Sequence, residues 1–179
     1  MKLQSVLALD TTAFFDYIKS IPYGYRDRAG KLHLEGEADF HDHEYRFSTP
    51  EEVVDQNCGW CWDVANLISC YCENHGIEHI TLFLEYNTPE LHQTHTQVFL
   101  KWNRMWCPAP DNSAVYSLGD GGRGVYEACR DNYAETFRSY LESVLKEHYE
   151  ESSLLVKPVT VPIPGGISDE EYLSLARKC

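Results

Sequence analysis

Apolar residues recur at helical spacing at several places along the chain. The clearest is residues 61–76, "CWDVANLISCYCENHG", where Gly76 stands at the position of a C-terminal cap. A second helix is predicted over residues 10–21, with Asp10 as its N-cap and a proline just beyond its end. A shorter helix is predicted within residues 48–56, where a Ser-Thr pair precedes a proline and two glutamates.

Strand-like segments follow the longest of these helices. Strands are predicted at residues 79–86, 96–102 and 104–110, with a tight turn at 103–104 between the last two. We expect these strands to form an antiparallel meander packed on the helix. After a Gly-rich loop, a long amphipathic helix is predicted over residues 125–149.

The remaining segments are richer in turn residues. Residues 23–47 contain scattered Gly, Asp and aromatic residues, which predict turns and short strands rather than a helix. Residues 157–179 form a Pro-rich extended tail with a short terminal helix that begins near Ser168. The pattern predicts an α+β fold, with a single domain over residues 1–156 followed by this tail.

Composition and charge narrow the function. The chain has 179 residues and a formal net charge of −13, which argues against binding to nucleic acid or to an anionic membrane. We find no apolar stretch of membrane-spanning length and no signal-peptide core. Seven cysteines, an odd number, favour thiols over a disulfide framework. We therefore expect a cytoplasmic protein, although export without a cleaved signal is still open.

The sequence "CGWC" at residues 58–61 allows several interpretations. A thioredoxin-like redox pair would follow a buried strand, whereas polar, helix-like residues precede Cys58. A structural zinc site would need a second pair of ligands. Cys107, His92 and His95 are candidates, but they form no second pair of recognised spacing. The remaining interpretation is that one of the two cysteines is a catalytic nucleophile.

Cys61 suits that role because it begins the longest helix, and the positive end of a helix favours a thiolate. Asp63 would oppose the thiolate, so we expect its side chain to point away as a structural cap. His95, at the head of the second strand, is the candidate base. A hairpin centred near the predicted turn pairs residue i with about 207 − i, and this places Asp111 beside His95 as the orienting carboxylate.

The segments "GWCWD", "HTQVFLKW" and "MWCPAPD" together resemble the motifs of the transglutaminase-like superfamily, in its small bacterial form. His95 follows Cys61 by 34 positions and Asp111 follows His95 by 16, as in those proteins. "CGWCW" is also similar to the papain-like signature, but the short interval to the histidine excludes the ordinary papain arrangement. The likeness covers about residues 23–111, and the two prolines before Asp111 depart from the family pattern.

The resemblance implies a papain-like core, in which the helix bearing the cysteine packs on an antiparallel sheet. It implies a catalytic triad of Cys61, His95 and Asp111 that acts on an amide bond of a protein or peptide through a thioester. Hydrolysis, deamidation and transamidation are all compatible with this chemistry, and no metal or cofactor is implied. Gln56 is a candidate oxyanion donor, and Trp62 is a candidate wall of the substrate site.

Two alternatives belong to other classes of protein. The first is an interaction module, either a non-catalytic member of the fold or a domain stapled by zinc. The second is a thiol–disulfide oxidoreductase that uses both cysteines of "CGWC". Thiol reactivity separates them from the enzyme, because a catalytic cysteine is alkylated rapidly at neutral pH whereas a zinc-bound cysteine is protected.

Overall fold

The computed structural model describes residues 2–40, 45–89, 92–102, 104–111, 142–143, 151–159 and 169–178. The predicted Gly-rich loop lies outside these residues. The predicted helix over 125–149 also lies outside them, apart from Glu142 and Ser143. None of the helices in the described part of the chain has the length and apolar character that a membrane span requires.

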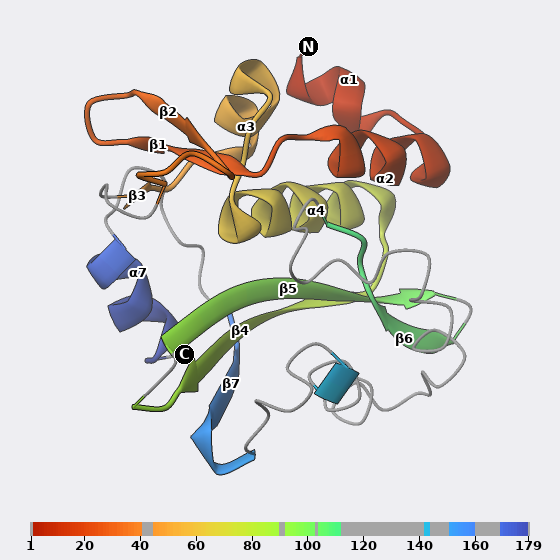
Figure 1. Ribbon diagram of the computed structural model, residues 1–179. Coiled ribbons are helices and arrows are strands. Elements are labelled where there is room, and N and C mark those ends of the chain that lie inside the picture. The colour runs from red at the N-terminus through yellow and green to blue at the C-terminus, as the bar shows by residue number, and fades with distance from the viewer. Residues whose placement is uncertain are drawn as a thin grey trace.

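The helices of the N-terminal half form where local signals predict them (Figure 1). Asp10 accepts a hydrogen bond of 2.9 Å from the Ala13 amide and caps the second helix. Thr49 and Glu52 form a capping box at the start of the third. Gly76, with a φ of 64°, ends the fourth in the left-handed conformation. The bounds are α1 Leu3–Leu7, which was not predicted, α2 Thr11–Ser20, α3 Pro50–Gln56 and α4 Cys61–His75.

A small antiparallel sheet lies beside the start of α4. Its strand order is β2-β1-β3, with Tyr25 paired to His33 in the hairpin of the first two strands. The turn of this hairpin contains Gly30, whose φ of 84° requires glycine-like freedom. The short strands expected between residues 23 and 47 are therefore confirmed as β1 Gly24–Asp27, β2 Leu32–Leu34 and β3 Tyr45–Arg46.

The larger sheet is also antiparallel, with the strand order β6-β5-β4-β7. The hairpin of β5 and β6 has the predicted register, because each residue number and its partner's sum to 207, as for Phe99 and Pro108. Arg104, with a φ of 67°, lies in the turn. β5 begins earlier than predicted, and β7 was not predicted. The bounds are β4 His79–Asn87, β5 His92–Trp102, β6 Met105–Pro108 and β7 Leu154–Pro158, which follows a 3-10 turn at Glu151–Ser153.

The main apolar core surrounds α4. Figure 1 shows α4 between β5 on one side and α1, α2 and α3 on the other. Val98 and Leu100 of β5 belong to the same buried cluster as the apolar residues of these helices. Tyr71 of α4 stacks on Phe14 of α2, with ring centroids 3.7 Å apart. This arrangement is α+β, and it fixes α4 against the sheet along its length.

A second cluster of buried residues, the aromatic cluster, lies at the start of α4. It joins the small sheet to the last helix, α7 Asp169–Ala176, which buries two of its residues. The predicted terminal helix therefore packs on the body of the protein, and the predicted domain boundary at 156 falls inside β7. The cluster consists of Tyr25, Phe40, Tyr45, Phe47, Trp62, Phe83, Tyr172 and Ala176.

Candidate active site

Cys61 is the first residue of α4, and its side chain is half-buried. Trp60, in an extended conformation, is the N-cap residue, and its amide donates a hydrogen bond of 3.0 Å to the Asp63 carboxylate. The first amides of a helix have no partner within the helix and carry partial positive charge. The sulfur of Cys61 therefore lies where a negative charge is stabilised.

Asp63 is fully buried and builds the start of this helix. One carboxylate oxygen accepts hydrogen bonds from the Tyr45 hydroxyl at 2.6 Å and from the Ser48 amide at 2.9 Å. The other accepts the hydrogen bond from Trp60. Burial raises the pKa of Asp63 to about 7, while these hydrogen bonds act in the opposite direction. The expectation that Asp63 serves as a structural cap is confirmed.

His95 of β5 is 2 % exposed and lies between the thiol and a carboxylate. Its Nε2 lies 3.5 Å from Oδ2 of Asp111, and the Cys61 thiol lies near enough to its ring to affect its pKa. Burial alone would lower the pKa of His95, but the hydrogen bonds and charges of Asp111 and Cys61 outweigh it and raise this pKa to about 9. The structure thus brings together the three residues that the sequence motifs singled out.

Asp111 follows the end of β6 and is 8 % exposed. The intervening segment is held by Ala109, whose amide donates a 2.8 Å hydrogen bond to the Val98 carbonyl and continues the hairpin ladder. The neighbouring prolines remove amide donors, but the bond that sets the register comes from the residue between them. The departure from the family motif therefore leaves Asp111 beside the histidine.

Gln97 is a further residue of the site that the sequence motifs did not single out. It is 2 % exposed, and its Oε1 lies 3.4 Å from Nε2 of His95. Its Nε2 donates hydrogen bonds to the carbonyls of Val98, at 3.1 Å, and Ala109, at 2.8 Å. Gln97 therefore ties the histidine to the segment that precedes Asp111. The signal in the sequence was weak, because Gln97 stands two positions after the histidine in a strand that holds several other polar residues.

The other two candidates are held in structural contacts. Both amide hydrogens of Gln56 are used, since its Nε2 donates to the Ser48 hydroxyl at 2.9 Å and to the Cys58 carbonyl at 3.1 Å. Its Oε1 accepts a hydrogen bond from Arg26. A role for Gln56 as an oxyanion donor, which stays a prediction, would require one of these bonds to break. Trp62 is 5 % exposed and is part of the aromatic cluster.

Cys58 has a different environment from Cys61. Its side chain is fully buried, and its sulfur packs against Gly24 of β1, where a Cβ atom would approach it to 3.1 Å. Burial and the charge of Asp63 raise the pKa of Cys58 to about 12, although Arg26 lowers it. Cys58 is therefore a packing residue whose thiol stays protonated at neutral pH.

Side chains of the kinds that bind metals gather elsewhere, on β2 and just after it. Among the residues that the structure describes, the ligand atoms of His33, Glu37 and Asp39 lie within 4.8 Å of one another, close enough to hold a metal ion. His33 also makes ion-pair contacts with Asp27, at 3.1 Å, and with Glu37, at 3.7 Å. A histidine between carboxylates makes such contacts without an ion. Neither cysteine of "CGWC" belongs to this group.

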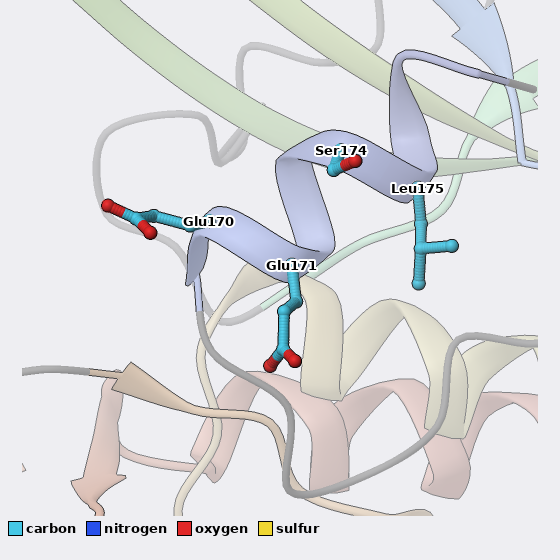
Figure 2. Close-up of a pocket in the computed structure, with 4 residues that line it drawn as sticks. All are labelled: Glu170, Glu171, Ser174 and Leu175. Carbon is cyan, nitrogen blue, oxygen red and sulfur yellow. The ribbon is translucent and has the colours of Figure 1, made fainter.

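A shallow pocket lies along the outer side of α7 and is lined by Glu170, Glu171, Ser174 and Leu175. Figure 2 shows Glu171 and Leu175 projecting from the same side of the helix, with Glu170 pointing away from them. Its lining does not include Cys61 or His95, so we do not assign it to the candidate site.

Comparison of the sequence with models of known protein families gave no match, and a search of curated proteins also gave none. The geometry of the site and the motifs within the sequence are therefore what indicate the function.

Proposed function

We propose that the protein is a cysteine-dependent acyl-transfer enzyme with Cys61 as nucleophile, His95 as general acid–base and Asp111 as the residue that orients the imidazole. One observation carries the proposal: a buried histidine has a carboxylate 3.5 Å from Nε2, and a thiol at a helix start lies near enough to help raise its pKa. This is the arrangement that activates a thiol for attack on a carbonyl group.

The proposed reaction starts from a thiolate–imidazolium pair. Since Nε2 of His95 faces Asp111, Nδ1 is the nitrogen that takes the thiol proton. The raised pKa of His95, about 9, favours the imidazolium at neutral pH. Its causes include Asp111 and Cys61, so both neighbours stabilise the charged form of the imidazole.

The sulfur then attacks the carbonyl carbon of an amide, and the carbonyl oxygen becomes an oxyanion. The backbone N–H of Cys61, at the start of α4, is a donor for that oxygen. The carbon–nitrogen bond breaks as His95 donates its proton to the departing amine, which leaves a thioester on Cys61. Water or a second amine attacks the thioester, His95 removes the attacking proton, and the thiol is regenerated.

The substrate class is an amide of a protein or peptide, so the activity is that of a peptidase, an amidase or a transglutaminase-like acyltransferase. The order of the triad on α4, β5 and the end of β6 supports a relation to the transglutaminase-like superfamily as part of this proposal. The enzyme would work in a reducing compartment such as the cytoplasm. The described cysteines are thiols rather than disulfides, and these are Cys58, Cys61, Cys70, Cys72 and Cys107.

A dithiol oxidoreductase would need both cysteines of "CGWC" as exchangeable thiols. The full burial of Cys58 and its pKa of about 12 speak against this alternative. The surroundings of Cys58 and Cys61 differ accordingly, because Cys58 packs against glycine whereas Cys61 lies near enough to His95 to raise its pKa.

Cys61→Ser and Cys58→Ser, compared in the full chain, test the proposal. The first readout is the rate of alkylation by iodoacetamide, mapped by mass spectrometry to each cysteine. The second is turnover of glutamine-containing peptides with and without a primary amine, which separates cleavage, deamidation and transamidation. We expect Cys61→Ser to abolish rapid alkylation and turnover, and Cys58→Ser to keep both. Equal losses in the two variants would favour the redox pair and overturn the proposal.

A further inference from the structure

Tyr172 of α7 bridges the two elements that carry Cys61 and His95. Its ring packs on Trp62, the residue after Cys61, with centroids 5.4 Å apart. Its hydroxyl forms a 2.5 Å hydrogen bond with the hydroxyl of Thr96, the residue after His95. A single side chain from the far end of the sequence therefore contacts the immediate neighbours of both proposed catalytic residues.

The surroundings hold Tyr172 firmly in this position. The side chain is 4 % exposed, and its ring also packs on Phe47, at 4.6 Å, and on Phe83, at 5.5 Å. The ring thus fills the space between the small sheet, the start of α4 and β4. Because cores of this density transmit small displacements, a change at Tyr172 is expected to move its neighbours.

A second contact fixes the other end of α7. Arg177 forms an ion pair with Glu85 of β4, with its Nε 2.9 Å from Oε2 of that carboxylate. Glu85 is itself 5 % exposed and also contacts His92 of β5 at 2.8 Å. α7 is therefore attached both to the sheet and to the aromatic cluster, so the position of Tyr172 does not depend on its own contacts alone.

Tyr45 lies near both the thiol and Tyr172. Burial raises the pKa of Tyr45 well above its usual value, and the nearby groups that raise it further include Asp63, Cys61 and Tyr172.

From these contacts we infer that Tyr172 is a positioning residue, which sets the distance between the Cys61 sulfur and the His95 ring by holding Trp62 and Thr96. The inference rests on the proposed function, and it gives α7 a part in positioning the proposed catalytic residues. Cys61 and His95 belong to different elements, and the separation of the thiol from the imidazole depends on how the start of α4 packs against β5. Misplacement of such a pair by about 1 Å costs on the order of 100-fold in rate, so a small side-chain bridge has a measurable effect.

The test uses two substitutions that each remove one end of the hydroxyl bridge. Tyr172→Phe keeps the ring in the aromatic cluster, and Thr96→Val keeps the volume of the side chain. We expect each variant to slow the alkylation of Cys61 at pH 7 by about 3- to 10-fold, the range that one hydrogen bond supplies. The pH profile of alkylation should shift in both. The double variant should lose little more than either single variant, because both remove the same bond.

Tyr71→Phe is the matched control. It also removes a buried tyrosine hydroxyl from a hydrogen bond, here a 3.0 Å bond to the Leu9 carbonyl, but it does so near the other end of α4. We expect it to reduce thermal stability by a similar amount and to leave the pH profile of Cys61 unchanged. The same shift in Tyr71→Phe would show that general loosening is responsible, and this would overturn the inference.

Two failures can be told apart in the same experiment. If the unmodified protein has no rapidly alkylated Cys61, the proposed function itself fails. If Cys61 reacts rapidly but Tyr172→Phe and Thr96→Val keep the original rate and pH profile, only the role of Tyr172 is overturned. A shift confined to these two variants supports it.

Discussion

The two ends of α4 carry the same kind of side chain in opposite chemical settings. Cys61 stands at the start of the helix, beside a histidine with a raised pKa. Cys70 and Cys72 stand in its second half, where burial and the charge of Glu73 raise their pKa values, that of Cys72 to about 12. The helix dipole adds to this contrast. The partial positive charge at the start of a helix favours a thiolate, and the partial negative charge at its end disfavours one.

The comparison teaches that partial burial does not decide the chemistry of a cysteine in this protein. Cys61 and Cys70 are both half-buried. They differ in the groups within reach, because one faces an imidazole and the other faces carboxylates. The following predictions test whether that difference is as large as the contacts suggest.

The largest effect is expected from a substitution that gives Cys61 surroundings like those of Cys70. His95→Gln removes the group proposed to accept the thiol proton, so Cys61 should then react as slowly as Cys70. A positioned acid–base group contributes about 10²- to 10⁴-fold to rate, and we expect a loss of turnover in that range. His92→Gln, three positions earlier on β5, is the control and should retain activity, because His92 contacts Glu85 rather than the thiol.

A smaller loss is expected from Asp111→Asn. The imidazole keeps its place but loses the carboxylate that favours its charged form, so turnover should fall by about 10- to 10³-fold, less than the roughly 10⁴-fold loss in serine triads. Thermal stability, measured in parallel, should change little. If asparagine left both the rate and the stability unchanged, Asp111 would be only a turn residue.

Cys61 and Cys70 can be compared directly in one molecule by measuring the alkylation rate of each as a function of pH. At pH 6.5 we expect Cys61 to react at least about 10-fold faster than Cys70, because a thiolate is the reactive form and the pKa of Cys70 is raised. The ratio should shrink as the pH rises and Cys70 ionises. Peptide mapping after short exposure to iodoacetamide measures both rates at once, and equal rates at every pH would contradict the contrast.

The smallest effect concerns Asp63, the cap that builds the start of α4. Burial raises its pKa in the folded protein to about 7, well above the usual range of an aspartate. For a group with a raised pKa, the stabilising contribution is complete below the unfolded value and is lost as the pH rises through the folded value. Asp63 should therefore be mostly protonated at pH 5 and ionised at pH 8.

Tyr45→Phe removes the 2.6 Å hydrogen bond to this carboxylate. We expect the free energy of unfolding to fall by about 1–2 kcal/mol, and to fall more at pH 8 than at pH 5, because the ionised carboxylate depends more on a donor. Chemical denaturation at the two pH values measures the difference. A loss that does not depend on pH would mean that Asp63 has the same charge in both conditions.

Local signals were sufficient to predict much of the site. The N-caps Asp10 and Thr49, the cap at Gly76 and the register of the β5–β6 hairpin each follow from a few neighbouring residues. Once the register was known, the position of Asp111 beside His95 followed from counting. The start of a helix and a tight turn are short-range features, so the sequence nearby determines them.

Long-range features escaped prediction for the same reason. β7 pairs with β4 across most of the second half of the chain, and its short stretch of apolar residues gives no sign of that partner. The bridge from Tyr172 to Thr96 likewise joins residues 76 positions apart. Gln97 was overlooked because a polar residue inside a strand identifies its role only when its partners are known.

The attachment of α7 has a consequence for the order of events during protein synthesis. Cys61, His95 and Asp111 all leave the ribosome well before Tyr172, which is separated from Asp111 by 61 positions. At about 5–20 residues per second, that interval lasts about 3–12 s. If Tyr172 sets the geometry of Cys61 and His95, the thiol of the nascent chain is not fully activated during this time. A nucleophile that reacts with amide bonds would then reach its full reactivity only after Tyr172 has been added to the chain.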